Sequence, residues 1–182
     1  MKIFRFLLML VACLLASRAA QATVVVAADL DELTRDARTI VRGRVVALEA
    51  RLTDDRRRVE TLVTLEAESY LKGTLGATVQ FRVPGGQLGR FRSIFVGAPE
   101  FVPGQRVVVF LGVRGPSIPY VLGLSQGAFH VEPGADGWTV MSPAIPTATA
   151  QAGKIVRGDP ERRPMALAEF ERQVRVLVGA SQ

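Results

Sequence analysis

Apolar and polar residues alternate over two long segments in the first half of the chain. Over residues 40–47 and 59–71 most odd-numbered positions are apolar, and all charged residues fall on even-numbered positions. Because successive side chains of a strand point to opposite faces, this period of two predicts two half-buried strands. The charged segment 53–58 between them predicts a hairpin turn.

The shared parity also predicts how these two strands pair. The apolar faces of both strands are odd-numbered and must lie on the same side of the sheet, so the numbers of two opposed residues add to an even value. A turn centred on Asp55 makes that sum 110, which places Arg44 opposite Glu66 and Arg42 opposite Glu68. Such opposite-charge pairs stabilise a sheet by about a few tenths of a kcal/mol each. A structure that pairs Arg44 with an odd-numbered residue would contradict this register.

Two amphipathic segments predict helices. In residues 29–37, Asp29 is a suitable N-cap, acidic residues crowd the first turn, and apolar residues three or four positions apart share one face. Residues 164–178 begin with a proline and carry an apolar stripe, which predicts a terminal helix. We expect the Pro-, Ala- and Thr-rich segment 142–163 to be a loop or linker.

Several shorter segments between the helices have the residue types of strands: 78–83, 90–96, 106–113, 120–124, 128–131 and 138–141. The run 107–111 is continuously apolar, so we expect it in the most buried strand. This order predicts a mainly β fold, a small closed or partly open β-barrel with a short N-terminal and a C-terminal helix, in a single domain over residues 23–182. The glycines inside the predicted strands fit the bends and bulges of a tightly coiled barrel: Gly43, Gly112 and Gly123.

Residues 1–22 are typical of a secretory signal peptide. A basic start precedes an apolar run over residues 6–16, which is too short to span a bilayer, and Ala20-Gln21-Ala22 suits a signal peptidase. We therefore expect a protein exported across the cytoplasmic membrane, periplasmic or extracellular, without a membrane span. Alternatively, Leu10-Val11-Ala12-Cys13 resembles a lipobox, which would make Cys13 the lipid-bearing N-terminus of an envelope lipoprotein. Mass spectrometry of the mature N-terminus distinguishes the two.

The composition excludes several classes of site. The chain has one His and one Cys, so it cannot build a zinc site from several such ligands, and we expect neither a metal nor a cofactor. Without Lys2, Arg5 and Arg18 of the leader, the net charge falls from +6 to +3, which is not the basic footprint of a nucleic-acid-binding protein. His130 lies between two apolar residues and is predicted to face solvent or a loop.

One short motif is typical of catalysis, but its context argues against that role. Residues 123–127 match the G-x-S-x-G nucleophile elbow, which needs a strand that turns into a helix at the serine, followed by an acid and a histidine. Here residues 128–131 continue as a predicted strand, and His130 follows Ser125 with no acid between them. We therefore expect no enzyme activity, and a serine hydrolase that uses Ser125 is a remote alternative.

Three other patterns have simple structural interpretations. The acid pair Asp54-Asp55 stands beside three arginines and predicts a solvated turn. Residues 84–89 are glycine-rich but lack the Lys-Ser/Thr of a P-loop. The interleaved Arg and Phe residues at 81–82 and 90–92 predict a barrel strand with exposed arginines rather than a base-stacking platform.

Four segments follow one another in a characteristic order. They are the short helix that runs into ARTIVRGRVV (33–46), the strand TLVTLEAESYLKG (61–73), the strands of 106–131 and the last helix. This order resembles the netrin-like, OB-type domain of the tissue inhibitors of metalloproteinases. The chain is also similar to uncharacterised bacterial secreted proteins with LKG, PGG and PEFVPGQRVVVFL segments.

The resemblance implies an OB-like barrel and a function in protein binding. In those inhibitors an N-terminal cysteine places its α-amino group and carbonyl on the protease zinc. The corresponding end here is Thr23, Val24, Val25 and Val26, which contains no cysteine. We therefore expect a secreted, non-catalytic protein-binding or structural module, with these residues as a partner-binding edge and an extracytoplasmic metalloprotease as one candidate partner.

Overall fold

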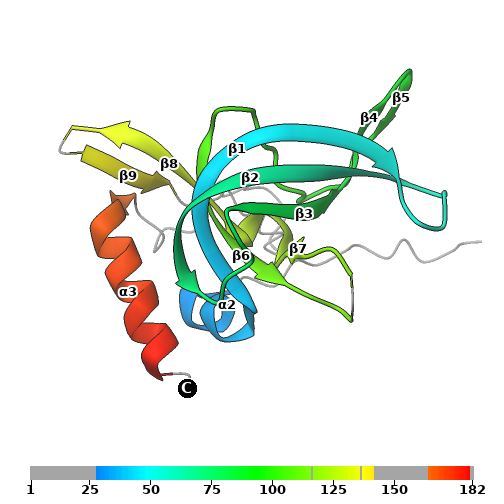
Figure 1. The fold of residues 1–182 in the computed structure, drawn as a ribbon. Helices are drawn as coiled ribbons and strands as arrows, with labels where there is room; N and C mark the ends of the chain where they lie inside the picture. Colours follow the sequence, from blue (N-terminus) through cyan, green and yellow to red (C-terminus); the bar gives the residue numbers. More distant parts are fainter. Residues whose placement is uncertain (1–27, 116, 136, 142–163, 181–182) are drawn as a thin grey trace, which may run out of the picture.

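The strands of the protein form a partly closed, OB-like barrel, described by a computed structural model over residues 28–115, 117–135, 137–141 and 164–180 (Figure 1). The wall consists of β1 (Thr39–Leu52), β2 (Val59–Lys72), β3 (Thr78–Pro84), β7 (Tyr120–Val121) and β6 (Arg106–Gly112), in that order, and β6 pairs back onto β1. The parallel contact between β3 and β7 is limited to Arg82 and Tyr120. This short seam is where the barrel is open, and the OB fold is likewise a five-stranded, partly open barrel.

The sheet extends beyond the barrel on one side. β7 and β8 (Ala128–Gly134) share the second edge of β6, with β7 opposite Leu111 and Gly112 and β8 opposite residues 106–109. β9 (Gly137–Met141) and the two-residue β10 (Met165–Ala166) follow β8. A separate small hairpin of β4 (Gly86–Leu88) and β5 (Phe91–Ser93) projects from the end of β3 (Figure 1).

Two helices cover the outer face of β1, β6 and β8. α2 (Leu30–Asp36) begins at Asp29, whose carboxylate accepts a hydrogen bond from the Glu32 backbone at 2.7 Å. α3 (Leu167–Ala180) contributes Phe170, whose ring centroid lies 4.9 Å from that of Phe129 on β8. Both predicted helices are confirmed. α3 begins three residues after Pro164, because β10 comes first.

The apolar core has two parts, which meet at β6. One part fills the barrel and contains Val107, Val109 and Leu111, whereas the other lies under the helices and contains Val108 and Phe110. Residues 107–111 alternate between the two parts and are all fully buried. This confirms the prediction for the most buried strand, and it explains the continuous apolar run, since a strand buried on both faces needs no polar positions.

The hairpin of β1 and β2 confirms part of the predicted register. Arg44 lies opposite Glu66, as predicted, but Arg42 lies opposite Ser69 rather than Glu68. The ladder carries three register shifts, at each of which one strand contains an extra residue. Arg42 nevertheless reaches the Glu68 carboxylate at 3.3 Å. The predicted sum of 110 thus holds only for Gly43–Val45 opposite Leu65–Ala67, and the sum is 111 at residues 41–42 and 47–52 of β1.

Other predicted elements differ in their bounds. The segment 90–96 forms a strand only over β5, and 120–124 forms one only over β7, because a short 3-10 helix, η1 (Leu124–Gly127), begins there. Gly123 therefore lies at the start of η1 rather than inside a strand. Gly43 does mark a close approach, since a Cβ there would lie 2.2 Å from the Glu66 carbonyl oxygen. The leader 1–22 and the segment 142–163 lie outside the described residues.

Candidate functional site

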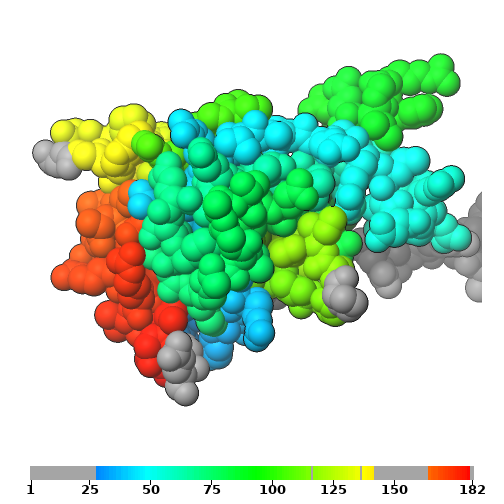
Figure 2. All heavy atoms as spheres, viewed as in Figure 1, coloured from blue at the N-terminus to red at the C-terminus, as the bar shows by residue number. Residues whose placement is uncertain are grey.

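The hairpin of β1 and β2 continues past the barrel wall as an arm. We define the arm as residues 46–64, comprising the end of β1, the turn 53–58 and the start of β2. In Figure 1 it curves away from the barrel, with the β4–β5 hairpin standing beside it, and Figure 2 shows the two as separate projections. Arg51 and Glu60 hold its two strands together through an ion pair at 2.8 Å, with the Glu60 carboxylate buried.

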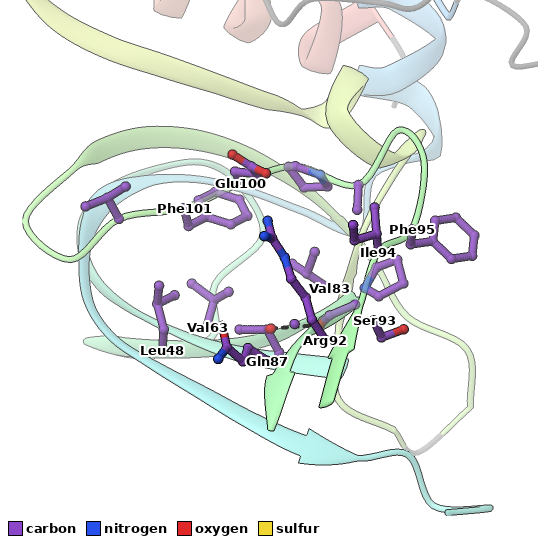
Figure 3. A pocket seen from close by; sticks show the side chains of 17 residues that line it. Leu48, Val63, Val83, Gln87, Arg92, Ser93, Ile94, Phe95, Glu100 and Phe101 are labelled. Atoms are coloured by element: carbon purple, nitrogen blue, oxygen red, sulfur yellow. Dashed lines mark hydrogen bonds between the residues drawn. The ribbon is translucent and has the colours of Figure 1, made fainter. Parts of the chain in front are cut away.

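A cavity of about 470 Å³ lies between the arm, the β4–β5 hairpin and the loop 94–105. Its floor is the open end of the barrel core, formed by Val63, Val83 and Phe101 (Figure 3). Phe101 packs edge-on against Phe81 with the ring centroids 5.5 Å apart. We call this space the mouth cavity. Its floor is apolar and fixed by the barrel, so it offers a preformed site for an apolar group.

The residues around the mouth cavity expose large apolar side chains. Ile94 and Val96 are 76% and 79% exposed. Together with these two, four neighbours form what we call the mouth rim: Leu48, Phe91, Phe95 and Val102. Four members of the rim line the cavity, whereas Phe91 and Val96 stand next to lining residues in the sequence. Half of the large exposed apolar residues in the described part of the chain belong to this rim. Single exposed apolar residues are ordinary, but a cluster around a cavity marks a binding surface.

Two charged side chains face each other across the mouth cavity. Arg92 extends from β5 over the opening, and Glu100 lies on the opposite side (Figure 3). Within the described residues the Arg92 side chain makes neither an ion pair nor a hydrogen bond, whereas the neighbouring Arg90 guanidinium lies 5.2 Å from the centroid of the Phe91 ring. Arg92 therefore offers an unused guanidinium beside an apolar floor.

The loop that carries Val102 is anchored at its base. Val45 and Gln105 are joined by a backbone hydrogen bond of 2.8 Å, and the Gln105 side chain accepts from the Val102 backbone at 3.2 Å. This leaves the Gln105 amide nitrogen to donate to His130 Nδ1 at 2.6 Å. Burial lowers the pKa of His130, while nearby Glu132 opposes the shift. The prediction that His130 faces a loop is thus confirmed, but its side chain is partly buried and holds that loop in place.

The serine of the G-x-S-x-G match lies in η1, between two strands. The Ser125 backbone donates to the Gly97 carbonyl at 2.8 Å, and its hydroxyl makes no hydrogen bond within the described residues. His130 bonds Gln105 instead. The chain continues from η1 into β8, as the sequence predicted, rather than into the helix that follows a nucleophile elbow. These contacts give no support to a catalytic role for Ser125.

The remaining sequence patterns are structural. In the turn 53–58 the Asp55 carboxylate accepts from the Thr53 hydroxyl and the Arg57 backbone, contacts that lower the pKa of Asp55. The glycines after Pro84 lead into β4, and a Cβ on Gly86 would lie 2.4 Å from the Thr61 hydroxyl. No group of three or more potential metal ligands occurs among the described residues.

A wider depression of about 980 Å³ beside α2 is also explained by the fold. Its lysine, Lys72, donates to the carbonyls of Thr34 and Arg35 at 2.7 and 3.1 Å. These carbonyls belong to the last turn of α2, where a positive charge stabilises the helix end. The ammonium group of Lys72 is therefore already bound by the helix end, and we assign no binding function to this depression.

The partner-binding edge predicted from the resemblance is not described by the structure. Thr23, Val24, Val25 and Val26 lie outside the described residues, and so does Cys13. The predictions for a signal peptide, a lipid anchor and an inhibitory N-terminus therefore stay predictions. In the described part of the chain, no helix has the length and apolarity that crossing a bilayer requires.

The sequence did not predict the mouth rim. The segment FRSIFVG (91–97) contains four large apolar residues, but they do not alternate with polar ones beyond Arg92, so the pattern indicated only a short strand. A usable signal was the crowding of apolar residues between two glycine- and proline-rich turns. Comparison of the chain with protein-family models, curated proteins and solved structures found no significant match.

Proposed function

We propose that this protein is an exported, non-catalytic binding module that docks a protein partner on the mouth rim. The observation that carries the proposal is the set of exposed apolar side chains that line the mouth cavity, among them Ile94 at 76% exposure, with Val96 exposed in the same loop. Large apolar and aromatic residues around a preformed cavity are the usual anchors of protein interfaces. The export signal predicted for residues 1–22 supports an extracytoplasmic partner.

The proposal is tested by site-specific photo-crosslinking in the exported fraction of the native cell. A photoreactive residue at Ile94 is expected to give a defined crosslinked protein, whereas the same residue at Val176 on α3, which is 67% exposed, is expected to give none. Val96→Asp should abolish the crosslink from position 94, and Val176→Asp should preserve it. Equal crosslinking from both positions, or none from position 94, would refute binding at the mouth rim.

The class of partner is a second, separable part of the proposal. The resemblance to metalloproteinase inhibitors supports an extracytoplasmic zinc protease, bound through the free α-amino group of Thr23. We expect the mature protein to inhibit such a protease, and one additional N-terminal residue to abolish inhibition. Unchanged inhibition by the extended protein would discard the N-terminal clamp while leaving the mouth rim as the docking surface.

A further inference from the structure

One edge of the arm lacks a neighbouring strand in the described part of the chain. β6 pairs with residues 39–44 of β1, and Gly104 and Gln105 continue the pairing at Val45 with backbone hydrogen bonds of 2.7 and 2.8 Å. The loop then leaves β1 at Pro103, which has no N–H to donate. Beyond this point Val46 is the extra residue of a bulge, and residues 47–52 pair with β2 alone. We call the side of these residues that faces away from β2 the free edge.

The free edge has the chemistry of a strand-binding site. In an antiparallel pair every second residue directs its N–H and C=O away from its partner strand. Natural sheets usually protect such edges with charged residues, proline, bulges or a covering element. This edge strand carries one exposed charge, Glu49, and a bulge at Val46, but it also exposes Val46, Leu48 and Leu52, at 46%, 37% and 46%. An extended polypeptide satisfies a row of backbone groups of this kind, whereas a helix does not.

The mouth cavity lies beside the free edge. Leu48 belongs to both (Figure 3). Val102 lines the cavity from the loop that leaves β1. A strand added at the free edge places every second side chain on the face that Leu48 occupies. Those side chains would enter the cavity above Val63 and Val83, which suit aliphatic or aromatic groups.

The charge at the cavity adds a further requirement on the ligand. Arg92 is the basic residue and Glu100 the acidic residue among those that line the cavity. Arg92 has no ion-pair partner within the described residues, and a guanidinium binds a carboxylate with two parallel hydrogen bonds. A ligand with one acidic group on the Arg92 side therefore complements this site.

We propose that the arm binds an extended peptide segment of the partner by strand addition to residues 46–52. The peptide places apolar side chains at alternate positions in the mouth cavity and an acidic side chain or a C-terminal carboxylate on Arg92. This inference rests on the proposed function, for which it specifies the mode of binding. The occupant is a partner peptide rather than a second copy of the chain.

The first test is selection of binding peptides from a displayed library of random peptides of about twelve residues, with the full-length exported protein as bait. We expect enriched sequences with apolar residues at every second position and one acidic residue. The Leu48→Asp variant should no longer bind the selected peptides, whereas the Val176→Asp variant should still bind them. Failure to enrich any peptide, or enrichment without alternation, would overturn the inference.

Two matched peptides then test the backbone and the charge. N-methylation at the residues that face β1 removes their hydrogen-bond donors and should weaken binding at least about tenfold. Arg92→Ala should reduce the affinity for the acidic peptide about tenfold and leave that for its amide analogue unchanged. Unchanged binding of the N-methylated peptide would show docking by side chains alone and would overturn strand addition.

Two results distinguish this inference from the proposed function. A crosslink from Ile94 together with no peptide binding would leave the mouth rim as a docking surface and discard strand addition. A concentration-dependent dimer in sedimentation that Leu48→Asp dissociates would assign the free edge to a second copy of the chain, and would likewise overturn the peptide as its occupant. A monomer that binds the selected peptide one to one is the expected result.

Discussion

The helix-covered face of the sheet and the mouth of the barrel differ in how their apolar residues are covered. On the helix-covered face, α2 and α3 pack on the sheet, and Phe110 and Phe129 are buried beneath them. At the mouth, side chains such as Ile94 and Val102 remain exposed in the described structure. The same strand, β1, runs through both regions. The comparison teaches that the helix-covered face supplies stability, whereas the mouth leaves apolar area available for a partner.

The comparison predicts its largest effect for two phenylalanines. Phe110 is fully buried and packs 5.5 Å from Phe129, whereas Phe91 is 65% exposed. Phe110→Ala should lower the free energy of unfolding by about 3–5 kcal/mol, because it removes buried contacts and leaves a cavity. Phe91→Ala should change it by less than about 0.5 kcal/mol. Urea unfolding of both variants checks this, and similar losses would show that the mouth is part of the folding core.

A smaller effect is expected from the ion pair that attaches α3 to the barrel. Glu171 lies 2.9 Å from Arg42, and its side chain is 13% exposed. Glu171→Gln should cost about 1.5 kcal/mol, because the partly buried Arg42 loses a charged partner. Glu66→Gln, which alters the exposed pair with Arg44, should cost less than about 0.5 kcal/mol. Thermal unfolding at low and high salt should show a larger salt effect for the Arg44 pair.

The cap of α2 should contribute less again. Asp29 accepts a hydrogen bond from the Glu32 backbone at the start of the helix. Asp29→Ala should destabilise the protein by about 1 kcal/mol, and Asp29→Asn by only a few tenths of that amount. Equal losses for both variants in chemical unfolding would show that the charge rather than the hydrogen bond is responsible. Peptide binding at the mouth should be unaffected by either variant.

The smallest effect concerns His130, which connects β8 to the loop of the mouth. The pKa of His130 is lowered in the folded protein by burial. Below about pH 6.5 the imidazole is therefore protonated more readily in the unfolded chain than in the folded protein. The contribution of His130 to stability is therefore present above that pH and is lost as the pH falls through its folded pKa. Unfolding from pH 7.5 to 5 should show a steeper loss for the wild type than for His130→Gln. Parallel curves would exclude this linkage.

Much of the fold was predictable because its strands and helices have one apolar face each. The alternation of apolar and polar residues predicted β1 and β2, and the N-cap at Asp29 helped to predict α2. The register was predicted only in part, because Val46 on β1 and Glu68 on β2 are extra residues in the ladder. A bulge of this kind depends on the curvature of the partly closed barrel, about which a periodic pattern carries no information. The shift at Val46 places Leu48, an even-numbered residue, on the side of the cavity.

The mouth could not be predicted in the same way. Periodicity reports which residues a fold buries, whereas the mouth rim consists of apolar residues that the fold leaves exposed. Ile94, Phe95 and Val96 lie in a loop, where no repeat relates sequence position to a face. Arg92 is a candidate binding residue only because β5 holds it at the cavity, and the sequence does not show that position. Sites of this kind come from the packing of distant segments, which the sequence pattern alone does not show.

The arm and the barrel wall are built from the same two strands. β1 and β2 are each fourteen residues long, and their pairing runs from Leu52 and Val59 down to the base of the barrel, with register shifts on the way. The arm is therefore continuous with the wall in both strands, although one of the shifts lies at Val46, where the arm begins. A partner bound at the tip of the arm is therefore coupled to the whole sheet. Its binding should raise the melting temperature of the entire protein rather than only reduce the motion of one local segment.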